Sequence, residues 1–232
     1  LAGAEMRPQV LVMADVPNWA WGRKARALQQ HLDSDFDVEI WYLKYGPAPD
    51  SFGLYHTFDF PNVGWVPPGR RALTGVTAHV WQTWGRDKVQ EWARRAVGLH
   101  ANSRRLLAEI EGLGLQDAQE APLPVYYVPN GVDADFFCRR RPPAPSDRLV
   151  VGHVGKPNPR KGAELLIAAC DAAGVELRCV QRTSNNALTP EEIREFYQDI
   201  HVLAVASDMD GTPNPALEAA ACEVAVLSNR IG

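Results

Sequence analysis

The chain has 232 residues, of which 46% are hydrophobic and 22% are charged, and its formal net charge is −4 at pH 7. This length can fold as one large domain or two small ones, and the composition is that of an ordinary globular protein. The negative charge argues against non-specific nucleic-acid binding, and no apolar run approaches the roughly 18–20 residues that span a bilayer.

The first half of the chain alternates β-rich runs with segments of helical spacing. Residues 9–15, QVLVMAD, form a nearly continuous apolar run, which is typical of a strand buried on both faces. Residues 22–32 follow with apolar side chains at helical spacing. Further strands are expected over 37–43, 54–58, 73–79, 97–101 and 124–131, and further helices over 86–96 and 103–114. Strands that alternate with helices predict βαβ crossovers and a parallel sheet.

The composition changes over residues 138–148, CRRRPPAPSDR, which are basic, proline-rich and without periodicity, as in a linker between domains. The alternation of strands and helices then restarts. Strands are expected over 149–155, 175–180, 201–207 and 224–230, and helices over 161–174, 189–198 and 214–222. In the helix 189–198, Thr189 and Glu192 have the spacing of a capping box, with proline at the first helical position. We predict an N-terminal domain over 1–137, a linker over 138–148 and a C-terminal domain over 149–232.

Ligands of open α/β sheets bind beyond the carboxyl ends of the strands, so strand-to-helix junctions are the places to look for a site. In GKPNPRKG, residues 155–162, a predicted strand runs into a loop that carries Lys156, Arg160 and Lys161 at the start of the next helix. Cations beside the free N–H groups of a helix N-terminus form an anion site. The alternative is that these three charges are solvated loop residues. The spacing of a Walker loop is absent.

A second junction, SDMDGTPNPALE at residues 207–218, runs from a predicted strand through two acids and a turn into a helix. Asp210 lies just before this helix and Glu218 lies one to two turns into it, so we expect the two carboxylates to share one neighbourhood. Carboxylates accept hydrogen bonds from sugar and ribose hydroxyls. The alternative is that Asp208 or Asp210 caps the helix and that Glu218 is an exposed acid.

Three segments together resemble successive signatures of retaining family-four glycosyltransferases of the GT-B fold. They are YVPNGVDADFF at 127–137, GKPNPRKG at 155–162 and DGTPNPALEAAACEVAVLS at 210–228. Their order and spacing match that family, while the first half matches through its order of strands and helices. The resemblance implies an α/β, GT-B-like architecture with two Rossmann-like domains. It also implies that the C-terminal domain is incomplete, because family members continue through more βα units.

The resemblance assigns roles to the residues of the two junctions. The family's Glu-x7-Glu pair appears here as Asp210 and Glu218, of which the first would face the hydroxyls of the transferred sugar and the second would bind the ribose. Lys156 and Lys161 fall at the family's usual Arg and Lys positions and would clasp the diphosphate together with Arg160. Two departures are clear: Asp210 is one methylene shorter than the usual Glu, and Lys156 lacks the planar guanidinium of Arg.

In the first half, His79 follows a predicted strand where the family often places a histidine near the reacting sugar, and His56 is the competing candidate. The family's glycine-rich turn after the first strand retains only Gly22. The implied catalytic residues are therefore His79, Asp210 and Lys161. The implied substrate-binding residues are Gly22, Gly155, Lys156, Arg160, Gly211, Thr212, Pro213, Asn214 and Glu218.

The function implied by the resemblance is transfer of a sugar from a nucleoside diphosphate donor, UDP or GDP, to a carbohydrate or lipid acceptor with retention of configuration. No metal or other cofactor is expected, because the cations of the loop replace a metal. One alternative is a metal-dependent GT-A enzyme that uses Asp208 and Asp210 as a D-x-D motif. The others are an epimerase or a phosphorylase of the same fold, and a catalytically weak nucleotide-sugar-binding module.

The chain carries no recognisable signal peptide, and its four cysteines show no metal-binding spacing. These observations predict reduced thiols and a cytoplasmic location. Arg23, Lys24 and Arg26 on the first predicted helix are either solvated or in peripheral contact with the inner face of an anionic membrane.

Overall fold

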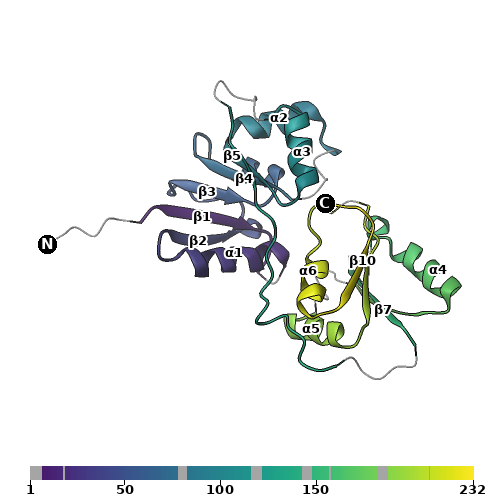
Figure 1. Cartoon of the computed structure of the whole chain (residues 1–232). Helices are drawn as coiled ribbons and strands as arrows, with labels where there is room; N and C mark the ends of the chain where they lie inside the picture. Colours follow the sequence, from purple (N-terminus) through teal and green to yellow (C-terminus); the bar gives the residue numbers. More distant parts are fainter. Residues whose placement is uncertain are drawn as a thin grey trace. The chain divides into compact units, whose positions relative to one another are not determined.

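The computed structural model describes residues 7–17, 19–77, 83–115, 122–142, 148–156, 158–181, 188–208 and 210–232. The chain divides into two compact units, Leu1–Val128 and Pro129–Gly232, and each contains one parallel sheet with helices packed on it (Figure 1).

The sheet of the first unit has six parallel strands in the order β2-β1-β3-β4-β5-β6. Its strands are β1 (Gln9–Ala14), β2 (Asp37–Tyr42), β3 (Leu54–Thr57), β4 (Ala72–Val76), β5 (Ala96–Ala101) and β6 (Val125–Tyr127). Its helices are α1 (Ala20–Leu32), α2 (Arg86–Arg94) and α3 (Arg104–Gly112), with short 3-10 helices η1 (Leu43–Tyr45) and η2 (Phe60–Trp65).

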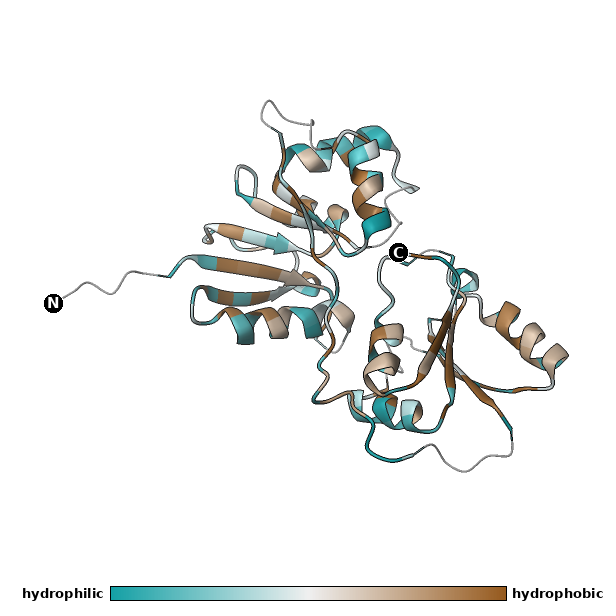
Figure 2. Cartoon of the chain, viewed as in Figure 1, coloured by the Kyte–Doolittle hydropathy of each residue, from teal (hydrophilic) through white to brown (hydrophobic). Residues whose placement is uncertain are grey.

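Helices cover both faces of this sheet, which explains the continuous apolar run of β1. Leu11 and Met13 belong to a core that also contains Trp92 of α2 and Ile110 of α3. The alternate residues of β1 belong to a second core that includes Ala25 of α1. Figure 2 shows β1 as mostly hydrophobic, and only its first residue, Gln9, is polar. Side chains alternate between the two faces of a strand, so a strand that is covered on both faces is apolar at consecutive positions.

The sheet of the second unit has four parallel strands in the order β10-β9-β7-β8. Its strands are β7 (Val150–Gly155), β8 (Glu176–Gln181), β9 (Val202–Val205) and β10 (Ala225–Ser228). Its helices are α4 (Ala163–Ala173), α5 (Pro190–Gln198) and α6 (Asn214–Ala221), with the 3-10 helix η5 (Pro159–Lys161) before α4. Figure 1 shows α4 on one face of this sheet and α5 and α6 on the other.

Residues 129–137 pack within the second unit, whereas the sequence analysis assigned them to the N-terminal domain. The reason is apolar burial: Phe137 is 7% exposed and lies in one core with Tyr197 of α5. The basic segment that follows also contacts this unit, since the amide of Arg140 donates to the side chain of Gln198 and Arg141 forms an ion pair with Asp199.

Every helix and strand that the sequence predicts is present, and the ends differ by a few residues. The capping box of α5 is confirmed, because Thr189 and Glu192 each bind the backbone amide of the other. The helix α4 begins at Ala163, later than predicted, because Gly162 adopts a left-handed conformation with φ +70° after the 3-10 turn. The strand β6 ends before Pro129, which has no N–H to donate to a sheet.

Each sheet has a point where the chain reverses the direction in which strands are added. In the first unit this point lies between β1 and β3, and in the second it lies between β7 and β9. The carboxyl ends of the two strands at such a point leave a crevice between the loops that follow them, and this is where α/β proteins bind ligands. The residues that follow β7 and β9 are therefore the first place to examine.

Candidate functional site

An ion pair joins the loops that follow the two strands at the switch point of the second unit. Lys161, just before α4, places its Nζ 2.5 Å from Oδ2 of Asp210, which follows β9. The side chains are 26% and 21% exposed, so the pair is accessible without being fully solvated. The parallel register of β7 and β9 explains this meeting, because it brings their carboxyl ends to the same edge of the sheet.

Hydrogen bonds to backbone groups hold the loop that carries Lys156, Arg160 and Lys161 in place. The Asn158 side chain accepts a hydrogen bond from the amide of Arg160 and so caps the 3-10 turn. The carbonyl of Arg160 accepts from the amide of Asp208 and the hydroxyl of Ser207, which connects this loop to the one after β9. A Cβ at Gly162 would lie 2.4 Å from the carbonyl oxygen of Ala206, so only glycine permits this approach.

The strand β7 carries a buried histidine beneath this loop. His153 is 4% exposed, and its Nδ1 lies 3.2 Å from the carbonyl of Ala204. Its Nε2 has no hydrogen-bond partner among the described residues. Gly155 leaves room for this nitrogen, because a Cβ at that position would lie 2.9 Å from it. Burial lowers the pKa of His153 and the nearby Lys161 lowers it further, against a backbone hydrogen bond to Ala204 that raises it. A neutral imidazole therefore lies below the lysine.

Asn130, from the segment 127–137, holds the turn before α6. Asn130 donates from Nδ2 to the carbonyl of Thr212 and to Oδ1 of Asn214, at 2.9 Å in both cases. The helix starts after Pro213, which provides no side-chain cap. Among the described residues, the backbone amides of Gly211 and Asn214 have no backbone partner outside the helix ladder. This turn can present N–H groups to an anion or to a hydroxyl.

Glu218 is buried in the second turn of α6, with only 5% of its surface exposed. Its Oε2 accepts a hydrogen bond of 2.9 Å from the hydroxyl of Tyr197 on α5. A buried carboxylate is costly unless it is hydrogen-bonded, and the tyrosine supplies such a bond. The alternative, in which Glu218 is an exposed helical acid, is therefore wrong. Asp210 and Glu218 also have different partners, since the first is paired with Lys161 and the second with Tyr197.

The other two cations of the loop are more exposed than Lys161. Lys156 and Arg160 are both exposed, and Arg160 contributes its carbonyl rather than its guanidinium to the contacts described above. All three cations lie between β7 and α4, and the structure brings Lys161 together with Asp210.

In the first unit, Gly22 lies in the first turn of α1, against the loop that follows β1. A Cβ at this position would lie 2.2 Å from the carbonyl oxygen of Val16 and 2.5 Å from that of Pro17. Glycine therefore allows the N-terminus of α1 to approach the carboxyl end of β1. The predicted residue His79 lies outside the described residues.

His56, the competing candidate, forms a pair with His100 near the carboxyl ends of β3 and β5. The two rings are stacked with centroids 5.1 Å apart, and their Nε2 atoms are 3.1 Å apart. Burial is the main cause that lowers the pKa of His56 to about 3 and that of His100 to about 4, and the nearby Lys24 adds to both shifts. Both rings are neutral at pH 7, so one donates a hydrogen bond to the other.

This pair predicts that acid destabilises the first unit. At a pH between the ordinary histidine pKa of about 6.5 and the lowered pKa values, the two imidazoles are protonated in the unfolded chain but not in the folded chain. The free energy of unfolding therefore falls as the pH falls through this range. Each imidazole contributes about 1.4 kcal/mol per pH unit. Asp59 acts in the opposite sense, since burial raises its pKa to about 7. The difference between the wild type and His100→Gln cancels the contribution of Asp59. It reports the imidazole of His100 together with the part of the His56 pKa shift that His100 causes.

The measurement is urea unfolding followed by tryptophan fluorescence, which reports on the first unit because all seven tryptophans lie before residue 93. Between about pH 6 and pH 5, the free energy of unfolding of His100→Gln should depend less steeply on pH, by about 1.4 kcal/mol per pH unit. His31→Gln, which removes an exposed imidazole from α1, is the matched control. Identical slopes for wild type and His100→Gln would contradict the prediction.

Within the part of the chain that the structure describes, no group of three or more His, Cys, Asp or Glu side chains is arranged to hold a metal ion. Every helix of that part is too short or too polar to traverse a bilayer.

Comparison with known proteins identifies the fold through structure rather than through sequence. No family model matches, and no curated protein is similar in sequence. A sucrose-phosphate synthase of Thermosynechococcus elongatus is similar in structure, with a TM-score of 0.71 and 15% identity over 97% of this chain and 82% of that chain.

Two further solved structures share the arrangement. One is a mutant of S. aureus TarM in complex with Fondaparinux, alpha-GlcNAc-glycerol and UDP, with a TM-score of 0.55 and 11% identity over 75% of this chain and 41% of that chain. The other is an alpha-glucosyltransferase in complex with UDP-glucose and DNA containing an abasic site. Its TM-score is 0.54, and it is 11% identical over 96% of this chain and 78% of that chain. This chain therefore has the GT-B fold of glycosyltransferases, as the sequence predicted.

Proposed function

We propose that this chain transfers a glycosyl group from a nucleoside diphosphate sugar to a hydroxyl of a carbohydrate or lipid acceptor. The proposal includes retention of anomeric configuration and independence from metal ions. The observation that carries it is the ion pair of Lys161 and Asp210 at the switch point of the second sheet, in a chain with the fold of glycosyltransferases.

The chemical difficulty of this reaction is the negative charge that grows on the departing diphosphate as the anomeric C–O bond breaks. Preorganised cations and helix N-termini stabilise such charge without reorganising. Lys161 lies directly before the N-terminus of α4, which has no side-chain cap. We assign Lys161 to the leaving group, with Arg160 and Lys156 as further diphosphate contacts. The backbone of the turn Gly211 to Asn214 faces the sugar and phosphate in this proposal, with the amides of Gly211 and Asn214 as the donors.

The two acids suit hydroxyl groups at different depths. Asp210 is partly exposed and lies beside the proposed diphosphate site, so we assign it to the hydroxyls of the transferred sugar. Glu218 is buried and oriented by Tyr197, and we assign it to the ribose. His79 remains our candidate for contact with the reacting sugar, and Gly22 our candidate for close backbone approach in the first unit.

The alternative D-x-D chemistry needs Asp210 as a ligand of a divalent cation. In the structure, Asp210 already has an ammonium group 2.5 Å away, so a metal would have to displace Lys161. The fold is also GT-B rather than GT-A. These two observations favour the metal-independent reaction.

The neighbours suggest which nucleotide to test first. Two of the similar structures contain UDP or UDP-glucose, so we propose UDP as the donor nucleotide and GDP as the second choice.

We propose that the reaction takes place in the cytoplasm. Peripheral membrane contact through Arg23, Lys24 and Arg26 stays a prediction, which sedimentation with anionic vesicles tests.

A thermal-shift panel of UDP-, GDP-, ADP- and TDP-sugars, each with and without EDTA, tests the proposal. We expect one nucleotide class to raise the Tm in both conditions, because a ligand that binds only the folded state stabilises it. Transfer activity with that donor should also persist in EDTA. Stabilisation without transfer or donor hydrolysis would favour a binding module, and loss of activity in EDTA would favour the D-x-D reaction.

A further inference from the structure

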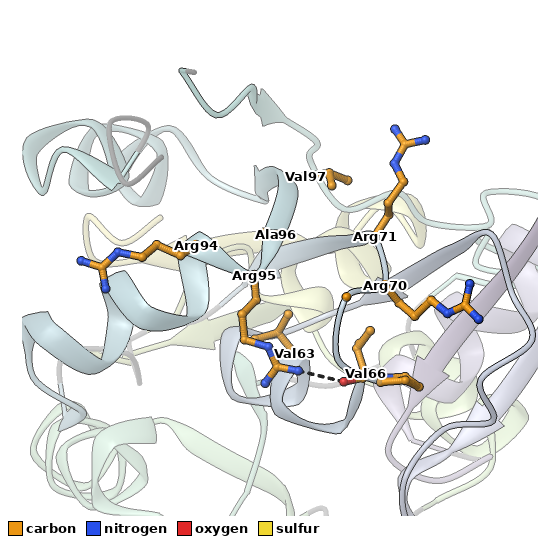
Figure 3. Close-up of a pocket in the computed structure, with 10 residues that line it drawn as sticks. Val63, Val66, Arg70, Arg71, Arg94, Arg95, Ala96 and Val97 are labelled. Atoms are coloured by element: carbon orange, nitrogen blue, oxygen red, sulfur yellow. Dashed lines mark hydrogen bonds between the residues drawn. The ribbon is translucent and has the colours of Figure 1, made fainter. Parts of the chain in front are cut away.

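A basic groove lies in the first unit, at the sheet edge opposite to the one that carries Gly22 and His56. Its volume is about 330 Å³, and it is bordered by the residues that precede β4 and β5. Four of its lining residues are arginines, namely Arg70, Arg71, Arg94 and Arg95, and no acidic residue lines it among those the structure describes. Figure 3 shows these side chains around the groove.

The topology explains why four arginines gather at this edge. An Arg-Arg pair directly precedes each of two neighbouring parallel strands, Arg70 and Arg71 before β4 and Arg94 and Arg95 before β5. The register pairs Ala72 with Ala96, so the residues before them are neighbours across the sheet. Adjacent strands lie about 4.8 Å apart, which places the two pairs side by side.

Two backbone features shape the groove. The amide of Arg70 binds the carbonyl of Pro67, and Gly69 between them has φ +78°, as in a type II turn with Pro68 at its second position. The register of β4 and β5 shifts after the pair Ala72–Ala96, which leaves Val97 as an extra residue on β5. Such a bulge redirects the strand, and bulges are frequent next to binding sites.

The four arginines of the groove differ in the contacts that hold them. Arg95 donates from Nη2 to the carbonyl of Val66 at 2.8 Å, which fixes one wall of the groove. Arg70 pairs with Asp50, which does not line the groove. The guanidinium of Arg71 has no hydrogen-bond or ion-pair partner within the described part of the chain. In Figure 3 the four side chains extend away from one another, so a ligand can contact more than one guanidinium group only if it carries several separated anionic groups.

We propose that this groove is a binding site for a small organic polyanion that carries two or more phosphate or sulfate groups. Arginine binds such oxyanions through paired N–H donors, and the volume is at the lower end of the range for small-molecule sites. The net charge of the chain is −4, so its overall field does not attract anions and the local cluster must do so. The site is separate from Lys161, which belongs to the other unit.

The test is calorimetric titration with inorganic tripolyphosphate. We expect one bound tripolyphosphate at the groove of the wild type, much weaker binding of orthophosphate, and at least tenfold weaker binding of tripolyphosphate to the double variant Arg71→Gln/Arg94→Gln. Both substituted residues are exposed, and Arg95 is kept because it contacts the backbone. The control variant Lys88→Gln/Arg105→Gln removes two positive charges from exposed positions of the same unit outside the groove. It should bind tripolyphosphate within twofold of the wild type.

A titration of Lys161→Ala separates this site from the proposed donor site, because the groove should bind tripolyphosphate equally well in that variant. Loss of all binding in Lys161→Ala would overturn the proposal. The proposal would also be overturned if the two double variants lost affinity for tripolyphosphate equally, or if the wild type did not bind it.

Sedimentation with phosphatidylcholine vesicles, with and without phosphatidylserine, distinguishes a free polyphosphate from a lipid headgroup as the source of phosphate. Binding to the anionic vesicles without binding of free tripolyphosphate would overturn the small-molecule site in favour of a membrane surface.

Discussion

Lys161→Ala should lower kcat by about 10²–10³-fold, which is the usual loss when one preorganised group that stabilises transition-state charge is removed. Donor affinity should change much less, because the full charge on the leaving diphosphate develops only in the transition state. The measurement is steady-state kinetics with the donor identified by the thermal-shift panel, together with calorimetric titration of the intact donor in the absence of acceptor. Similar losses in kcat and in affinity would remove Lys161 from this role.

Two further variants separate catalysis from structure. Lys161→Ala leaves the carboxylate of Asp210 without its ammonium partner, and a partly buried unpaired charge destabilises a protein. The double variant Lys161→Ala/Asp210→Asn removes both charges and should regain the lost stability but not the activity. Lys156→Ala is the comparison within the same loop, since it removes a more exposed lysine that we assign to a further diphosphate contact. It should reduce kcat by less than tenfold.

The ion pair has a consequence for the order of events at the site. In the structure, Nζ of Lys161 lies 2.5 Å from Oδ2 of Asp210. A diphosphate that approaches this lysine competes with the carboxylate for its N–H donors, and the carboxylate then becomes available to sugar hydroxyls. Donor binding therefore exchanges one ion pair for two ligand contacts, which limits the net gain in affinity. This exchange is the physical reason for expecting a larger effect on turnover than on binding.

The fold followed from periodicity because both sheets are covered on two faces. Continuous apolar runs such as residues 9–15 and 149–155 indicate buried parallel strands, and the intervening segments repeat with helical spacing. The end of β6 and the start of α4 were harder to place, since they depend on Pro129 and on the left-handed Gly162. The domain boundary drawn from composition differs from the observed boundary between the two units, because Phe137, which precedes the basic segment, is buried in the second core.

The candidate site was only partly accessible from the sequence. Residues at strand ends were identifiable, since their position follows from the order of strands and helices. His153 was missed although it interrupts an apolar run in VGHVG, which was the available signal. Asn130 lay within a resembling segment, but its bonds to Thr212 and Asn214 join residues more than 80 positions apart. Contacts of that kind depend on tertiary packing that no local pattern encodes.

Glu218→Gln should weaken binding of the nucleoside diphosphate by about ten- to a hundredfold, which corresponds to the loss of a hydrogen bond to a charged group. The substitution keeps the size of the side chain, and its amide oxygen can still accept from the hydroxyl of Tyr197. The buried position should therefore tolerate it, whereas Glu218→Ala leaves the tyrosine hydroxyl unpaired and opens a cavity. Calorimetric titration with the nucleotide measures the effect, and circular dichroism checks the fold.

Tyr197→Phe provides the complementary test, because it removes the donor and leaves the charge of Glu218 in place. The lost hydrogen bond should cost about 1 kcal/mol of stability, and nucleotide affinity should fall by less than in Glu218→Gln. Glu191→Gln, at an exposed acid of α5, is the matched control and should leave affinity unchanged. Unchanged affinity in Glu218→Gln would mean that the buried carboxylate serves only to join α5 to α6. Ribose recognition would then have to come from another residue of the second unit.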